Sequence, residues 1–282
     1  MKERNNKGSI AIAFCSLYKD WVSHKEHIIK SFINLNNAFH GECFFIICIQ
    51  DFGDNTIDSK FGLHNYNVIY LTEVGISLAR NRCIDEAQSM NCKWIMFHDA
   101  TIYWPVNAAN FIYEKRLSEI PPKVKLKFSD ISEDEIDNHK YSIKNINPIY
   151  ETYIGAMLLN LNVIDSLRFN ELHGPGDKTI YKSGEDVLFS FDYFSKKHDF
   201  RVCEANKLEI YHPPRLNDFE KHKIYARGQG RVFRVLLTKH FSLQLVFDSI
   251  LFFGNAIFRC VLFKKNSFTI LSERIVGFFD EV

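Results

Sequence analysis

The stretch IAIAFCS at Ile10–Ser16 decides the fold, because it is a continuous apolar run with β-branched residues that reads as a buried strand. A second run, CFFIICI at Cys43–Ile49, ends at the turn-forming sequence Asp51-Phe52-Gly53-Asp54. Between the two runs, Asp20–Ala38 places apolar residues near helical spacing. Strands that are apolar throughout and joined by a helix indicate a parallel sheet covered on both faces.

The pattern continues outward along the chain. Val68–Leu71 and Trp94–Phe97 are predicted to be further strands, with an amphipathic helix at Ser77–Met90 between them. We therefore expect an α/β fold: a single Rossmann-like domain with a mostly parallel central sheet, followed by a C-terminal amphipathic helical tail. Ligands of such sheets bind beyond the carboxyl ends of the strands, where Asp51 and Asp99 lie.

Composition excludes several classes of protein. Hydrophobic residues make up 46% and charged residues 24% of the 282 residues, which excludes a disordered chain. The formal net charge is +1, so a globally basic nucleic-acid binder is not indicated and no nucleic-acid partner is expected. The seven cysteines are scattered and form no CxxC, which predicts buried thiols in a reducing compartment rather than disulfides or structural zinc.

The chain divides into residues 1–214, expected to form the α/β domain, and residues 215–282, expected to be helical. Within the first part, residues 121–148 are Lys-rich, then acidic, then Asn-rich, which predicts a surface loop. In the second part, Phe241–Leu262 has about the length of a membrane span. We expect instead a helix on the surface of an anionic membrane, or a helix packed on the core, because its polar residues cluster within about 60° of a helical wheel. These residues are Gln244, Asp248, Asn255 and Arg259.

Several short motifs follow one another in a set order. After Ile10–Ser16 and Asp51 they are GISLARN (75–81), WIMFHDAT (94–101), GAMLLN (155–160), RFNELHGPG (168–176), SGEDVLF (183–189) and YHPP (211–214). Each is weak alone. Together, over roughly residues 9–240, they resemble the family 2 glycosyltransferases with the GT-A fold, particularly bacterial enzymes of surface-polysaccharide assembly.

This resemblance implies an inverting glycosyltransferase in polysaccharide, O-antigen or capsule assembly, located in the cytoplasm on the inner face of the cytoplasmic membrane. The donor would be a nucleotide-diphospho-sugar, with UDP as the expected nucleotide, and the acceptor a hydroxyl of a saccharide or lipid-linked saccharide. Asp186 matches the family's general base. The residues implied in donor binding are Ser16, Asp51, Arg80, Asp99 and Arg231, and those near the acceptor or sugar are Gly155, Ala156 and Glu185.

The resemblance also implies a metal site. The family's DxD motif corresponds to Asp99-Ala100-Thr101, and His212 matches a late histidine that often completes the site. Thr101 replaces the usual second carboxylate, and a neutral hydroxyl is a much weaker ligand for a hard cation. The expected cofactor, Mn²⁺ or Mg²⁺, is therefore in doubt.

Two other functions remain open. A catalytically inactive, GT-A-like scaffold that binds nucleotide sugars would explain Thr101, although the presence of Glu185, Asp186 and His212 argues against it. A nucleotidyltransferase shares a similar sheet but needs a Gly-rich phosphate loop after the first strand. The sequence Ser16-Leu17-Tyr18-Lys19 has no glycine there.

Overall fold

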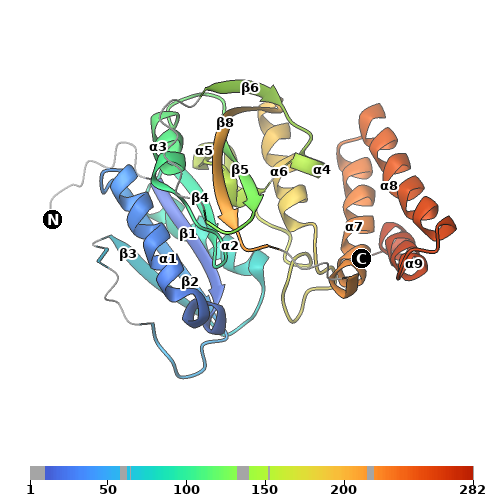
Figure 1. Cartoon of the computed structure of the whole chain (residues 1–282), viewed down its shortest axis with the longest axis horizontal. Coiled ribbons are helices and arrows are strands. Elements are labelled where there is room, and N and C mark those ends of the chain that lie inside the picture. Colours follow the sequence, from blue (N-terminus) through green and yellow to red (C-terminus); the bar gives the residue numbers. More distant parts are fainter. Residues whose placement is uncertain are drawn as a thin grey trace.

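A parallel sheet forms the centre of the molecule (Figure 1). The computed structural model describes residues 10–57, 62–63, 65–131, 140–151, 153–214 and 219–281. Five strands form the central sheet in the order β3-β2-β1-β4-β7, all parallel except β7, which runs antiparallel to β4. Their bounds are β1 (Ile10–Leu17), β2 (Cys43–Gln50), β3 (Tyr66–Leu71), β4 (Trp94–Asp99) and β7 (Leu159–Asn160).

Helices cover both faces of this sheet. Side chains alternate along β1, so that Ile12 and Phe14 pack under α1 and α3, whereas Ala13 and Cys15 pack under α2 and α6. All seven cysteines are buried and free, as the sequence predicts. The helices are α1 (Tyr18–Ala38), α2 (Ile76–Ser89), α3 (Val106–Glu114), α4 (Pro148–Glu151), α5 (Leu161–Ile164), α6 (Glu185–Lys197), α7 (Phe219–Lys239), α8 (Leu243–Val261) and α9 (Ser267–Phe279), with a 3₁₀ turn at Ile154–Ala156.

A second sheet corrects the prediction of a surface loop at residues 121–148. Its strands β5 (Pro122–Phe128) and β6 (Tyr141–Asn145) both pair with the long strand β8 (Arg201–His212). Lys123 and Lys144 share the buried carboxylate of Glu204, at 2.5 and 2.7 Å. Two of the lysines that suggested an exposed loop therefore face a buried acid of the neighbouring strand. Residues 132–139 of the predicted loop lie outside the described residues.

The C-terminal helices α7, α8 and α9 pack together beside α6, and α8 lies farthest from the central sheet (Figure 1). Helices α7 and α9 come into close contact because two glycines face the partner backbone. A Cβ at Gly230 would collide with the carbonyl oxygen of Arg274, and one at Gly277 with that of Arg227. The expected fold class, a mostly parallel α/β sheet followed by a helical C-terminal region, is confirmed and is consistent with a GT-A fold.

Candidate active site

A cleft of about 690 Å³ opens at the carboxyl ends of β1, β2 and β4. This is the edge at which α/β sheets bind ligands. The opposite wall comes from the segment before α6, from the first turn of α6 and from the beginning of α7. The polar and charged residues that line the cleft include Ser16, Asp20, Gln50, Arg80, Asp99, Thr101, Tyr153, Asp177, Lys182, Glu185, Asp186 and Lys221.

Arg80 joins the two walls of the cleft. Its side chain is only 4% exposed, and its guanidinium donates to Asp186 on α6 and to Asp99 at the end of β4, the latter at 3.2 Å. Glu185 Oε1 lies 3.8 Å from Arg80 Nη1. Three carboxylates from two elements thus surround one cation, and the guanidinium also lies over the rings of Phe97 and Phe169.

The pKa values in this cluster follow from burial and from the imbalance of charge. Burial alone would lower the pKa of Arg80, but Asp186, Asp99 and Glu185 raise it instead, so the guanidinium stays charged. Burial, followed by the charge of Asp186, raises the pKa of Glu185 to about 7. Burial also raises the pKa of Asp186, although Arg80 opposes the shift. Near neutral pH, the cluster therefore contains a carboxyl group that can exchange a proton.

Tyr153 is a cleft residue that sequence reasoning missed. Its hydroxyl donates to Asp99 Oδ2 at 2.5 Å, and together with Arg80 it outweighs burial and lowers the pKa of Asp99. Gly155 makes this position possible, because a Cβ there would lie 2.7 Å from Tyr153 Cε1. Gly155 and Ala156 are both buried outside the cleft lining. The small residue thus accommodates the tyrosine ring, where we expected a close approach of sugar or acceptor.

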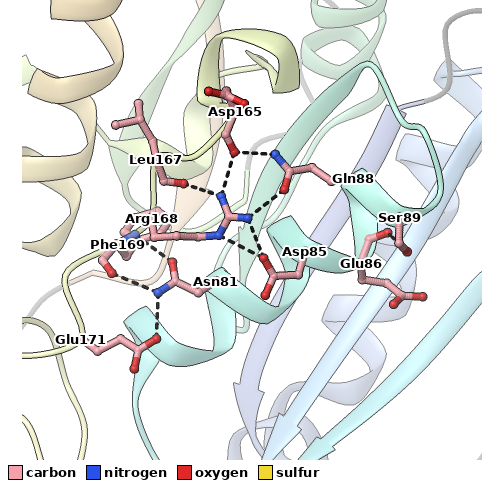
Figure 2. A network of polar contacts seen from close by, with 10 residues as sticks. All are labelled: Asn81, Asp85, Glu86, Gln88, Ser89, Asp165, Leu167, Arg168, Phe169 and Glu171. Carbon is pink, nitrogen blue, oxygen red and sulfur yellow. Dashed lines mark hydrogen bonds and ion pairs between the residues drawn. The ribbon is translucent and has the colours of Figure 1, made fainter.

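A hydrogen-bond network holds the 168–176 segment against α2 (Figure 2). Asn81 donates to the carbonyl of Phe169 at 3.0 Å and accepts from its backbone N–H at 2.7 Å. Arg168 binds Asp85 at 2.7 Å and Gln88 at 2.8 Å. Farther along, Ser77 donates to the carbonyl of His173 at 2.7 Å. The network explains the GISLARN and RFNELHGPG motifs as the framework that fixes the cleft wall.

The structure brings only some of the predicted site residues together in the cleft. Ser16, Arg80, Asp99 and Thr101 line the cleft, as do Glu185 and Asp186. Asp51 does not, because it lies in an exposed turn with φ 52° just beyond β2. The preceding residue, Gln50, lines the cleft instead, and its Oε1 accepts from the backbone N–H of Gly75 at 2.6 Å.

Arg231 also lies outside the cleft lining. It donates to the backbone carbonyl of Asp280 at the end of α9, and its guanidinium lies 5.8 Å from the ring centre of Tyr181. Its placement ties α7 to α9, which differs from the predicted contact with a diphosphate. Besides Arg80, the described basic residues of the cleft lining are Lys182, which donates to the carbonyl of Gly176 at 2.6 Å, and Lys221 on α7. Sequence reasoning missed Lys221 because it belongs to none of the ordered motifs.

The residues expected to hold a metal do not form a preassembled site. His212 is half-buried outside the cleft lining. Its ring lies tilted 5.2 Å from that of Phe128, and its Nδ1 is hydrogen-bonded to the carbonyl of Pro213 at 2.7 Å. Both oxygens of Asp99 already accept hydrogen bonds, from Arg80 and Tyr153. Over the described ranges, no group of three or more His, Cys, Asp or Glu residues is arranged to hold a metal ion. The donor set therefore does not fit the expected Mn²⁺ or Mg²⁺ site.

Comparisons with known proteins give a distant structural likeness. No family model and no curated protein sequence matches the chain. S. aureus TarS is similar with a TM-score of 0.47 and 16% identity, covering 84% of this chain and 44% of TarS. TarS 1–349 in complex with UDP gives a TM-score of 0.48 and 14% identity, and its complex with UDP-GlcNAc gives 0.47 and 14%. Each of these covers 96% of this chain and 89% of that one.

This likeness is too distant to transfer the roles of residues. The chain spans less than half of the length of TarS. The candidate site therefore rests on the geometry of this chain alone.

Proposed function

We propose that the chain is a glycosyltransferase that moves a sugar from a nucleotide-diphospho-sugar to a hydroxyl of a saccharide or lipid-linked saccharide. The observation that carries the proposal is the cluster of Arg80, Asp99, Asp186 and Glu185 at the carboxyl edge of the sheet. It places carboxylates able to accept a proton in a cleft large enough for a nucleotide sugar. The ordered motifs of the sequence support the same reaction.

The proposed reaction is a direct displacement at the anomeric carbon, which inverts its configuration. Asp186 takes the proton of the acceptor hydroxyl as the new glycosidic bond forms and the bond to the diphosphate breaks. Arg80 is a positioning residue, because its guanidinium is occupied by Asp186 and Asp99. Lys182 and Lys221 line the cleft and supply positive charge for the departing diphosphate.

Asp186→Asn tests this assignment. Turnover is followed as UDP released from a panel of UDP-sugars in the presence of saccharide and lipid-linked saccharide acceptors. We expect the variant to lower turnover by about 10²–10⁴-fold, the usual contribution of a positioned base. Affinity for UDP, measured by calorimetry, should change little. Asp192→Asn is the matched control, since this carboxylate lies on the same helix and binds Lys239 and His240 away from the cleft.

The outcomes separate the candidate functions. Near-normal turnover in a folded Asp186→Asn protein would exclude this residue as the base, and a large loss in Glu185→Gln would then assign the role to Glu185. Binding of UDP-sugars without turnover by the parent protein, across the acceptor panel, would favour the inactive scaffold. Binding of neither UDP nor UDP-sugars would contradict the proposal.

A further inference from the structure

Helix α8 exposes most of its large apolar side chains to water. Its buried face carries the polar Asp248 and Ser249, which are 4% and 8% exposed, beside the apolar Leu245, Ala256 and Cys260. Asp248 accepts from Asn147 at 2.8 Å and from Gln244 at 3.2 Å. The opposite face carries large apolar side chains, with Phe247 56%, Ile250 63% and Phe258 60% exposed. A helix in contact with water on its free side has the opposite arrangement.

The exposed apolar side chains of α8 form one continuous face. At about 100° per residue, the face from Leu243 to Val261 occupies a sector of about 120°. The polar residues that cluster on the wheel border this sector, and among them Asp248 turns inward. The carboxylate of Asp248 is hydrogen-bonded inside the molecule, so this member of the polar cluster faces the protein.

The same surface extends beyond α8. In the turn to α9, Phe263 is 83% exposed and is followed by the exposed Lys264 and Lys265. On α9, Phe268 and Phe279 are 62% and 71% exposed. We call the exposed apolar residues between positions 243 and 279 the apolar patch. The rings of Phe263 and Phe268 lie 6.4 Å apart, and exposed phenylalanines on two successive helices and their turn are typical of a membrane or protein contact.

Two exposed bases, Lys264 and Lys265, stand in the turn of the apolar patch directly after Phe263. The acids of the same region lie elsewhere, with Asp248 buried and Glu273, Asp280 and Glu281 on α9 or just after it. Near the patch, Arg259 and Arg274 each have a buried Nε–H that has no hydrogen-bond partner among the described residues. Burial and then the charge of Arg259 lower the pKa of Arg274 to about 10, so two cations lie close together. The Nε–H groups of these arginines are buried, whereas the exposed ammonium groups of Lys264 and Lys265 are complementary to phosphate groups.

We propose that the apolar patch docks onto an anionic phospholipid bilayer, with α8 and α9 lying along its surface and the neighbouring bases contacting lipid phosphates. Helix α8 is long and apolar enough to cross a membrane, with a mean hydropathy of 1.4. Two of its polar residues, Asp248 and Ser249, are however buried against the rest of the protein, which favours a surface position.

Co-sedimentation of the full chain with vesicles tests the proposal. We expect binding to vesicles that contain phosphatidylglycerol and much weaker binding to pure phosphatidylcholine. The double variant Phe247→Ser/Phe258→Ser should lower the affinity by more than tenfold while leaving the circular dichroism spectrum unchanged. Ile143→Ser is the matched control, because Ile143 is also 56% exposed but lies on β6.

A second variant separates charge from apolar insertion. Lys264→Gln/Lys265→Gln should weaken binding to the anionic vesicles about 30-fold, since each base near such a surface contributes about 1 kcal/mol. It should leave binding to phosphatidylcholine unchanged. Free inorganic phosphate at millimolar concentration should not release the protein if the phosphates belong to lipid.

Three results would overturn the proposal. One is equal vesicle binding by the parent and both double variants. Another is resistance of the bound protein to alkaline carbonate extraction, which would indicate a spanning helix. The third is a lipid-free dimer in analytical ultracentrifugation that Phe247→Ser/Phe258→Ser dissociates, which would assign the patch to a second copy. None of these readouts depends on turnover, so the docking surface is tested independently of the proposed transferase activity.

Discussion

The cleft and the C-terminal helices differ in where they place charged and apolar side chains. In the cleft, charged groups are buried and paired, with Arg80 held by Asp99 and Asp186. On α8, the carboxylate of Asp248 is buried without a cationic partner among the described residues, while phenylalanines are exposed. The first arrangement fixes reacting groups inside a folded core. The second stabilises a surface that is suited to a solvent other than water.

The comparison shows that buried charges have two different roles in this chain. The buried charges of the cleft carry a net excess of carboxylates, so their protonation responds to pH. The buried Asp248 joins α8 to Asn147, before α4, and orients the helix. Substitutions in the two regions should therefore change the free energy of unfolding by different amounts and with a different dependence on pH.

The largest expected effect on stability is that of Arg80→Met. The substitution removes the guanidinium and leaves three carboxylates facing one another, and breaking a buried ion pair from one side costs about 3–5 kcal/mol. Urea unfolding at pH 7 measures the change. The free energy of unfolding of Arg80→Lys should lie between those of the parent and Arg80→Met, because lysine keeps the charge but lacks the forked guanidinium that reaches two carboxylates.

Arg201→Met is the control for this experiment, since Arg201 binds Asp199 at an exposed position. We expect its free energy of unfolding to be close to that of the parent. An equal loss in the Arg80 and Arg201 variants would show that the cleft cluster contributes no more than a surface ion pair, and the comparison between the two regions would fail.

Glu185→Gln should act in a pH-dependent way. The folded-state pKa of Glu185 is about 7 against an ordinary value of 4.5, so the folded protein binds more protons between these values. The stability of the parent should therefore fall as pH rises through this window, by about 3 kcal/mol from this group. Glutamine does not titrate, so the stability of Glu185→Gln should not fall in this way.

The measurement is a pair of unfolding curves at pH 4.5 and pH 8. The variant should match the parent in acid and be the more stable of the two at pH 8. A difference that is the same at both pH values would contradict the assignment of this titration to Glu185.

The smallest effect is expected on the exposed face of α8. Leu245 is 2% exposed, and Leu245→Ala should cost about 2–5 kcal/mol. Phe247 lies two residues away on the other face, and Phe247→Ser should change stability by no more than about 0.5 kcal/mol in lipid-free buffer. Thermal unfolding compares the two. Comparable losses would mean that Phe247 is packed in solution, which would remove the contrast between the regions.

The sequence predicts the central sheet well because its strands are apolar throughout. The predicted strands at Ile10–Ser16 and Cys43–Ile49 agree with β1 and β2 to within one residue. Strand β5 was missed, although PKVKLKF alternates lysine with apolar residues at the period of a strand. Its lysines favoured a loop only because Glu204, which pairs with Lys123, comes 81 residues later in the chain.

The candidate site could be predicted only in part. Arg80 and Asp186 are 106 residues apart, so their ion pair depends on the tertiary fold. Motif order identified both, but it assigned Arg80 to the donor where the structure shows it holding carboxylates. Tyr153 had no signal of its own, because its contact with Asp99 depends on the small Gly155 two positions later. Asp51 was predicted from its place in the turn after the second strand and from the family resemblance, and neither shows that the preceding Gln50 turns into the cleft.

Helix α7 has a consequence for the size of the acceptor. Its first turns, at Lys221 and Tyr225, line the cleft, and its later turns are locked to α9 at Gly230. Helix α7 lies beside α8 (Figure 1), so on a bilayer contacted by α8 its fixed packing on α9 would hold the cleft at one height above the lipid. An acceptor anchored in the same membrane would then present its hydroxyl only when the length of its headgroup matches that height, so the protein would select acceptors by reach as well as by chemistry.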